Sequence, residues 1–209
     1  MADDHSLILA GLRKLVEVEC DVVGTVENGR ALVEAAQKLR PDLILLDISM
    51  PLLNGLEAAR QLRVLVPGSK LIFLTMHASP TYATEAFQAG ASGYLLKRSA
   101  ASELSLAIKS VFQGQHYLTP LITKDVLDSV LKPSIGERGK KISSAVLTAR
   151  QREVLQLVAE GRGTKEVATI LNVSVKTVEF HKSRIMQQLD LHTTADLTKY
   201  AITHGITGL

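Results

Sequence analysis

The sequence has little of several features that would identify a protein class at once. Cys20 is its single cysteine in 209 residues, which excludes a disulfide framework and a cysteine-rich metal site and is typical of a reducing compartment. No apolar run is long enough to span a bilayer, and residues 1–5 lack the basic and apolar regions of a secretory signal. We therefore expect a cytoplasmic protein with no membrane partner.

Net charge is also small. The 24 Lys and Arg against 21 Asp and Glu leave +3, which alone does not indicate a nucleic-acid partner. The charges are unevenly placed, however: residues 1–131 carry 12 basic and 14 acidic side chains, residues 132–141 carry 4 and 1, and residues 142–209 carry 8 and 6. An acidic first part and a basic second part, joined by a basic connector, predict two domains with different partners. Ordinary hydrophobic (46%) and charged (22%) contents exclude a disordered chain.

The first half alternates short apolar runs with segments of helical period. The runs have strand length and lie at Cys20–Val26, Leu43–Leu46, Leu71–Leu74 and Gly93–Leu96. Helical patterns occupy residues 6–16, 29–39, 54–66, 79–89 and 101–113. Continuous apolar runs suit strands that are covered on both faces, so the alternation predicts a doubly wound α/β domain with a parallel sheet.

Polar residues follow the predicted strands. Asp47, Thr75 and Lys97 each stand at a strand end, and Asp3 and Asp4 precede the first helix. Chemistry in such sheets collects at this edge, where carboxylates suit Mg²⁺ and an ammonium and a hydroxyl stabilise phosphoryl oxygens. A carboxylate can itself be the nucleophile. Simpler readings stay open: the acids as caps, the threonine bonded to its own backbone, and the lysine in solvent.

These motifs together resemble the receiver domains of NarL/FixJ-type response regulators. The matching segments are Asp3-Asp4-His5, Leu46–Pro51, Asn54-Gly55, Leu74–His77 and Gly90–Lys97, and the resemblance covers about residues 3–113. It implies a flavodoxin-like sheet with strand order 2-1-3-4-5.

The resemblance also implies a role for each polar residue. Asp47 would accept phosphate from a sensor histidine kinase. Mg²⁺ would be held by Asp4, Asp47 and the backbone carbonyl of Ser49, with Asp3 assisting through water. Lys97 and Thr75 would contact the phosphoryl oxygens. Tyr94 would be the aromatic switch, with plain core packing as its alternative.

The sequence departs from this family at its first strand. Only Met1 and Ala2 precede the acidic pair, whereas the family has several buried apolar residues there. Because that strand is central in the sheet, we expect its truncation to expose the backbone edges of both neighbours. A start codon placed too late, a truncated chain and a shortened receiver are the explanations, and we favour a missing segment.

The second half predicts a connector and a small all-α domain. We expect the receiver over residues 1–115, a helical connector and linker over 116–143, and the helical domain over 144–209. Residues 132–141 are rich in Pro, Gly and charge, as linkers are. Helical patterns follow, beginning after the N-cap Thr148 and then at residues 164–171, 175–189 and 194–204. The middle two, joined by a tight turn, predict a helix-turn-helix with Val178, Ile185 and Leu189 on its buried side.

Residues 145–207 resemble the LuxR-type DNA-binding domain. The resemblance rests on Leu147–Leu155, Gly161, Lys165–Ala168, Ser174–His181, Ile185 and Leu189. It implies that Glu179, Phe180 and Ser183 face the bases, and that phosphates are held by Lys165, Lys176, Thr177, Lys182 and Arg184. Glu179 would accept from a cytosine or hold a neighbouring lysine, and we favour the second. The last helix would be a dimer surface, with core packing as its alternative.

The sequence therefore predicts a regulator that binds promoter DNA as a homodimer when phosphorylated, with no enzymatic activity of its own. A DNA-binding protein whose receiver no longer uses phosphate is the first alternative. An aspartyl-phosphate phosphotransferase is less favoured, because such enzymes carry a second Asp where this chain has Ser49, and no P-loop or other enzyme motif is present.

Overall fold

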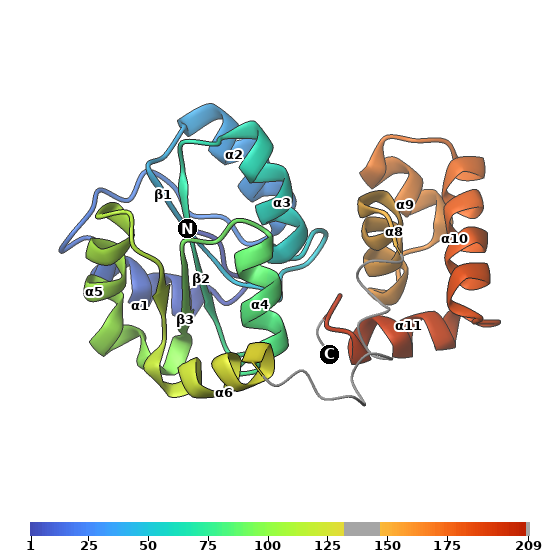
Figure 1. Cartoon of the computed structure of the whole chain (residues 1–209). Helices are drawn as coiled ribbons and strands as arrows, with labels where there is room; N and C mark the ends of the chain where they lie inside the picture. The colour runs from blue at the N-terminus through green and yellow to red at the C-terminus, as the bar shows by residue number, and fades with distance from the viewer. Residues whose placement is uncertain (132–146, 208–209) are drawn as a thin grey trace. The chain divides into compact units, whose positions relative to one another are not determined.

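The computed structural model describes residues 1–131 and 147–207, which form two compact units (Figure 1). The predicted linker, residues 132–141, lies outside the described residues.

The N-terminal unit is a parallel sheet covered by helices on both faces (Figure 1). Its strands are β1 (Leu43–Leu46), β2 (Lys70–Thr75), β3 (Gly93–Leu96) and β4 (Tyr117–Leu118), paired in the order β1-β2-β3-β4. Its helices are α1 (Ser6–Val16), α2 (Gly29–Leu39), α3 (Gly55–Leu65), α4 (Pro80–Gln88), the 3-10 turn η1 (Lys97–Ser99), α5 (Ala100–Phe112) and α6 (Pro120–Leu131). The predicted doubly wound α/β architecture is confirmed.

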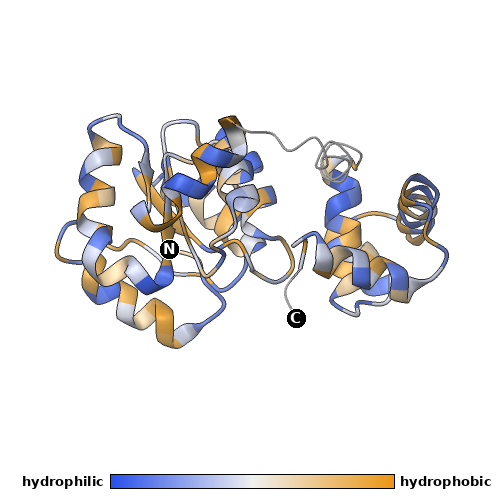
Figure 2. Cartoon of the chain, turned by 60° about the horizontal axis from the view of Figure 1, so that its bottom comes forward, coloured by the Kyte–Doolittle hydropathy of each residue, from blue (hydrophilic) through white to orange (hydrophobic). Residues whose placement is uncertain are grey.

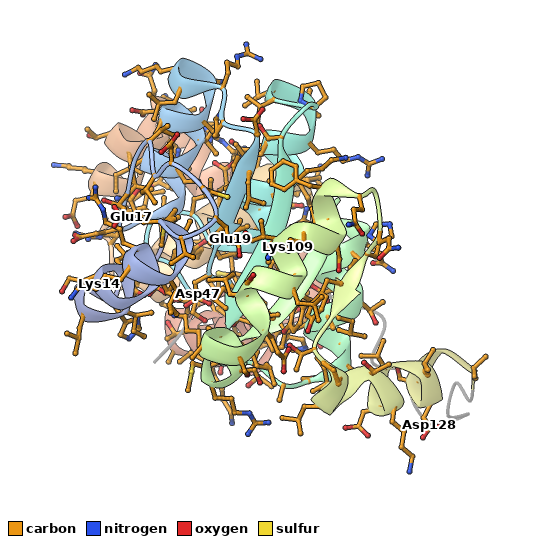
Figure 3. The ribbon with its side chains drawn as sticks, turned by 90° about the vertical axis from the view of Figure 1, so that its left-hand side faces the viewer. Lys14, Glu17, Glu19, Asp47, Lys109 and Asp128 are labelled. Atoms are coloured by element: carbon orange, nitrogen blue, oxygen red, sulfur yellow. The ribbon has the colours of Figure 1, made fainter. Side chains whose placement is uncertain are left out.

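Alternating strand residues explain how the helices are attached. Ile72 and Leu74 of β2 point to the face that α1 and α5 cover, and they form one core with residues such as Leu12 and Leu104. The other face is covered by α2, α3 and α4 (Figure 1). On the surface, Lys109 of α5 pairs with Glu19, just after α1, at 2.9 Å (Figure 3). Hydrophilic and hydrophobic residues alternate along these helices, as one-sided burial requires (Figure 2).

The prediction of a strand over Cys20–Val26 is wrong, because these residues do not form a regular strand. Only Val26 pairs, through an isolated parallel bridge to Ala2. Ala2 makes a second bridge to Leu46, so the segment Met1–Asp3 lies between the two, in the central position of the expected strand order. Met1–Asp3 is long enough to pair only with the end of the Cys20–Val26 segment. The other residues of that segment have no strand beside them to pair with, and they therefore stay irregular.

The expectation that both neighbours of this segment have exposed edges is therefore wrong at the carboxyl end of the sheet. Ala2 donates to the Leu45 carbonyl at 2.8 Å and accepts from Asp47 N–H at 3.0 Å, while Asp3 donates to the Val26 carbonyl at 3.1 Å. Beside Met1, a small apolar gap lined by Leu9, Leu12, Leu45 and Leu74 lies between α1 and the strands. The backbone that carries Asp3 and Asp4 is thus anchored on both sides.

The strand β4 was not predicted. It extends the sheet by pairing with β3, and α6, which follows it, packs against α4. Thr119, which lies between β4 and α6, attaches both of them to β3. Its N–H donates to the Tyr94 carbonyl, and its hydroxyl accepts from Leu96 N–H at 3.1 Å. The sequence-based boundary at residue 115 precedes both elements, which pack with the N-terminal unit.

The C-terminal unit is all-helical, as predicted, with α8 (Ala149–Ala159), α9 (Thr164–Leu171), α10 (Val175–Leu189) and α11 (Thr194–Thr203). Local signals set the helix ends. Thr148 and Gln151 form a capping box at the start of α8, and Ser174 caps α10 by accepting from Thr177 N–H at 3.1 Å. Asn172 ends α9 in the left-handed conformation, with φ of 51°. A single core joins the four helices.

Candidate functional site

The carboxyl edge of the sheet brings together the predicted polar residues of the N-terminal unit. Asp47 follows β1 directly, Thr75 is the last residue of β2, and Lys97 follows β3. Asp47 lies at the end of the sheet beside α1 (Figure 3). Because β1, β2 and β3 are parallel and in register, their ends reach the same edge, and the side chains of Asp47 and Lys97 meet there.

Lys97 lies between two carboxylates. Its Nζ is 2.7 Å from Asp47 Oδ2 and 2.6 Å from Asp3 Oδ2, and its side chain is 5% exposed. Burial works against the charged ammonium, but the hydrogen bonds and charges of Asp3 and Asp47 outweigh it and raise the pKa of Lys97. The simpler reading of Lys97 as a solvated charge is therefore wrong.

Asp47 is held in a fixed orientation by the chain that follows it. Its Oδ1 accepts from Ile48 N–H at 2.6 Å, and its Oδ2 faces Lys97. The chain then turns back, so that Gly55 N–H donates to the Ile48 carbonyl at 2.8 Å. A Cβ on Gly55 would lie 1.9 Å from the Asp47 carbonyl oxygen, so only glycine fits there.

Asp3, Asp4 and Asp47 form a cluster with His5 in which one ligand atom from each lies within 4.8 Å of the others. Three carboxylates form the oxygen-rich donor set that suits a hard cation such as Mg²⁺. Asp3 and Asp47 are buried, while the Asp4 side chain is 36% exposed and leaves room for water ligands. The residues present therefore fit Mg²⁺.

His5 is a further residue of this cluster, one for which the sequence predicts no role. Its Nδ1 lies 2.8 Å from Asp4 Oδ1 and 3.2 Å from Asp3 Oδ1, and the backbone N–H of His5 donates to Asp3 Oδ1 at 3.0 Å. The ring thus draws the two acids together at the start of α1. The sequence could have predicted this contact, because His5 directly follows the two acids.

His77 is a further residue at this edge to which sequence reasoning gave no role. Its Nε2 hydrogen-bonds Ser49 Oγ at 2.8 Å, and its ring stacks on Tyr82 at 4.3 Å between centroids. Burial lowers the pKa of His77, although the charge of Asp47 acts against this. The predicted metal contact of Ser49 involves its backbone carbonyl, and that role stays a prediction.

Thr75 and Tyr94 are both fully buried. The Thr75 hydroxyl accepts from His77 N–H at 3.3 Å, which is the local backbone contact of the simpler reading. The Tyr94 hydroxyl donates to the His77 carbonyl at 2.7 Å, and burial raises the pKa of this phenol. Thr75 and Tyr94 thus contact the same loop residue from two neighbouring strands.

In the C-terminal unit, α9 and α10 form the predicted helix-turn-helix. Val178 and Ile185 are buried, as predicted, and Leu189 is partly buried. Of the residues predicted to contact DNA, Thr177 and Lys182 are half-buried. The others are exposed: Lys165, Lys176, Glu179, Phe180, Ser183 and Arg184.

Contacts on α10 distinguish these residues further. Phe180 is 57% exposed, and the guanidinium of Arg184 lies 5.6 Å from its ring centroid, a cation–π distance. Lys182 donates to Thr194 Oγ1 at 3.0 Å, which ties α10 to α11. Glu179 is exposed and makes no ion pair with any described residue, so its contact with a neighbouring lysine and its contact with a cytosine both stay predictions.

The last helix contributes to the core of the C-terminal unit. Leu197 and Ala201 of α11 are buried in it, so the alternative of core packing holds for this face. The opposite face carries exposed residues, Ala195 and Lys199 among them. The predicted dimer role of α11 thus concerns only that outer face and stays a prediction. Among the described helices, none combines the length and the apolar character needed to cross a bilayer.

Comparisons with known proteins match each unit separately. The sequence model of the response regulator receiver domain matches residues 1–109. That of bacterial regulatory proteins of the luxR family matches residues 145–201.

Similar proteins match the whole chain. The oxygen regulatory protein NreC of Staphylococcus epidermidis is 36% identical, over 97% of this chain and 95% of its own. The response regulator UvrY of Escherichia coli is 34% identical, over 99% and 94%. Among solved structures, a complex of the two-component response regulator RcsB with DNA matches with a TM-score of 0.58 and 28% identity, over 95% of this chain and 94% of RcsB.

Proposed function

The chain belongs to the two-component response regulators that join a receiver domain to a LuxR-type DNA-binding domain, and from this premise we propose that phosphorylation of Asp47 controls its binding to promoter DNA. Proteins of this family are transcriptional regulators rather than enzymes.

The observation that carries the proposal is the orientation of the Asp47 carboxylate. Ile48 N–H fixes Oδ1, and Lys97 faces Oδ2. In the transfer, a carboxylate oxygen of Asp47 bonds to phosphorus as the P–N bond of a phosphohistidine on the sensor kinase breaks, which leaves an acyl phosphate on Asp47. The ammonium of Lys97 then has a phosphoryl oxygen as partner in place of one of its two carboxylates.

Asp4, Asp47 and the Ser49 carbonyl would hold Mg²⁺, with Asp3 acting through water. The ion would compensate negative charge on the phosphoryl oxygens. Asp3 keeps its Lys97 contact in the absence of phosphate, and this contact holds the buried carboxylate in place. His5 orients Asp3 and Asp4 from the other side.

Thr75 and Tyr94 would respond to the phosphate. The Thr75 hydroxyl, now bonded to His77 N–H, would turn to a phosphoryl oxygen, and Tyr94 would follow through its bond to the same residue. Phosphate would thereby shift the equilibrium between two arrangements of the loop after β2.

The DNA contacts follow from the exposed side of the helix-turn-helix. Lys165, Lys176, Lys182 and Arg184 supply positive charge for phosphates, and Thr177 a hydroxyl. Glu179, Phe180 and Ser183 would face the bases of the major groove. A homodimer would place two copies of α10 on adjacent half-sites. RcsB, to which the chain is similar, has been solved as dimers on DNA.

The test is phosphorylation by a small-molecule phosphodonor with Mg²⁺. Wild type should gain one acid-stable, hydroxylamine-sensitive phosphate, and Asp47→Asn should gain none. The matched control is Asp42→Asn, an exposed acid just before β1, which should be modified like wild type. Modification that survives in Asp47→Asn would contradict the assignment.

The same samples test the control of DNA binding. Phosphorylated wild type should bind a promoter fragment more tightly than the untreated protein, and Asp47→Asn should not respond to the donor. An equal affinity of the modified and unmodified protein would favour the alternative in which the receiver does not use phosphate.

A further inference from the structure

The helix α6 presents one face to the receiver and an unused face to solvent. Ile122 is buried, and Thr123 and Val126 are half-buried. At 3.6 residues per turn, the side of the helix opposite these three carries the stripe Leu121, Lys124, Asp128 and Leu131. All four residues of the stripe are exposed, and Asp128 points away from the rest of the unit (Figure 3).

The stripe has leucines at its ends and opposite charges between them. Leu121 is 57% and Leu131 74% exposed. Lys124 and Asp128 make no ion pair with any described residue, although they are four positions apart on the same helix. A cation that precedes an anion at this spacing is the weaker orientation for an intrahelical pair. Within the part of the chain that the structure describes, both charges are therefore available to a partner.

We infer that α6 is an interface to α6 of a second copy of this chain, packed antiparallel about a two-fold axis between Lys124 and Asp128. An isologous contact requires that residue i meets residue j and that j meets i. The stripe satisfies this requirement, because Leu121 of one copy meets Leu131 of the other while Lys124 meets Asp128, and both contacts occur twice. In a parallel pair, Lys124 would instead lie beside Lys124 and Asp128 beside Asp128, so that like charges would meet.

The contacts that attach α6 to β3 connect this interface to the receiver site. Thr119 and Ile122 anchor the first turn, and Thr119 is fully buried. Its N–H and hydroxyl bond the backbone of β3 at Tyr94 and Leu96, directly before Lys97. The side chain of Thr123 donates to the Thr119 carbonyl at 3.1 Å, which fixes the helix on this anchor. The position of the stripe therefore follows the position of β3.

Charge reversal tests the pairing without depending on phosphorylation, because it uses the full unphosphorylated chain at high protein concentration. Lys124→Asp places Asp beside Asp128 in both contacts, and we expect it to weaken self-association by about tenfold in sedimentation equilibrium. Asp128→Lys should do the same. The double variant K124D/D128K exchanges the charges and should restore self-association to near the wild-type value.

Cysteine cross-linking tests the direction of the pair, in a Cys20→Ser background. The double variant L121C/L131C should form a covalent dimer on oxidation, because the two positions meet across the two-fold axis. The single variants L121C and L131C should not, since identical positions would lie about 15 Å apart.

Several results would overturn the inference. It fails if the double charge variant associates no better than the single ones, or if the single cysteine variants cross-link as well as the double variant. It also fails if the chain stays monomeric while thiols at 121 and 131 are protected from a maleimide reagent, because the stripe then packs against another part of its own chain. Circular dichroism of each variant separates these outcomes from a failure to fold.

Discussion

The hydroxyl of Tyr94 donates a 2.7 Å hydrogen bond to the backbone carbonyl of His77. The bond joins the middle of β3 to the loop that follows β2, at the same edge of the sheet as Asp47. It satisfies a polar group on a side chain that is otherwise fully buried, and it holds the ring inside the protein. Tyr94 is thus both a core residue and a polar link between two strands of the site.

Removing this hydroxyl should cost stability without opening a cavity. Tyr94→Phe leaves the His77 carbonyl without its donor and should lower the free energy of unfolding by about 1–2 kcal/mol. Tyr94→Ala also removes the ring and should cost about 3–5 kcal/mol. Chemical denaturation measures both. The control is Tyr82→Phe, whose ring stacks on His77 and whose change should stay within about 0.5 kcal/mol. Equal effects of the two Phe variants would contradict the role of the bond.

Gly55 should be intolerant of any side chain. Its missing Cβ would lie 1.9 Å from the Asp47 carbonyl oxygen, and this neighbour is backbone that cannot move aside easily. Gly55→Ala should therefore destabilise the receiver by about 3 kcal/mol and reduce phosphorylation of Asp47.

Gly11 provides the matched control for Gly55. It lies in the interior of α1 with no atom within 4 Å of its Cβ position. Gly11→Ala should stabilise the protein by up to about 1 kcal/mol, because alanine is the better helix former. Thermal unfolding of both variants measures the contrast, and a loss in Gly11→Ala would argue that its surroundings are more crowded than described.

Lys176 and Phe180 should affect DNA binding in different ways. Lys176→Gln should weaken binding to all duplexes and lower the slope of log affinity against log salt by about 1. Phe180→Ala should leave that slope unchanged and reduce discrimination between promoter and unrelated DNA. Fluorescence anisotropy at several salt concentrations measures both quantities. Lys38→Gln, an exposed cation on α2, should leave both as in wild type; a reduced slope in this variant would show that the receiver contacts DNA.

Tyr117 should give the protein an alkaline stability limit. Burial, with the charge of Glu103 and the 3.2 Å hydrogen bond to it, raises the pKa of Tyr117 to about 12, above its usual value of about 10. The folded state therefore keeps this proton at a pH where the unfolded chain loses it. The resulting stability is fully present below about pH 10 and is lost as pH rises towards 12.

Tyr117→Phe tests this dependence because it cannot titrate. Its free energy of unfolding should fall less steeply than that of wild type between about pH 10 and pH 12. Urea denaturation at a series of pH values gives the slopes, and tyrosinate absorbance follows the ionisation itself. Parallel slopes in the two proteins would contradict the assignment.

The sequence determined the features that depend on neighbouring residues along the chain. The bounds of α1, α2, α9 and α10 agree with the predicted ranges, because helical period and local caps such as Asn28 and Ser174 act over one or two turns. The three strand ends that supply Asp47, Thr75 and Lys97 were readable for a similar reason, since each is a polar residue that ends a continuous apolar run.

Tertiary structure decided the rest, because strand pairing and side-chain contacts need partners far away in the chain. Ala2 has no strand signal of its own, yet it completes the centre of the sheet by pairing with Val26 and Leu46. The two residues of β4 are too few to show a period, and their pairing with β3 alone makes them a strand. Likewise, Lys97 meets Asp3 and Asp47 only because parallel strands end at one edge. That edge turns five scattered polar residues into one site.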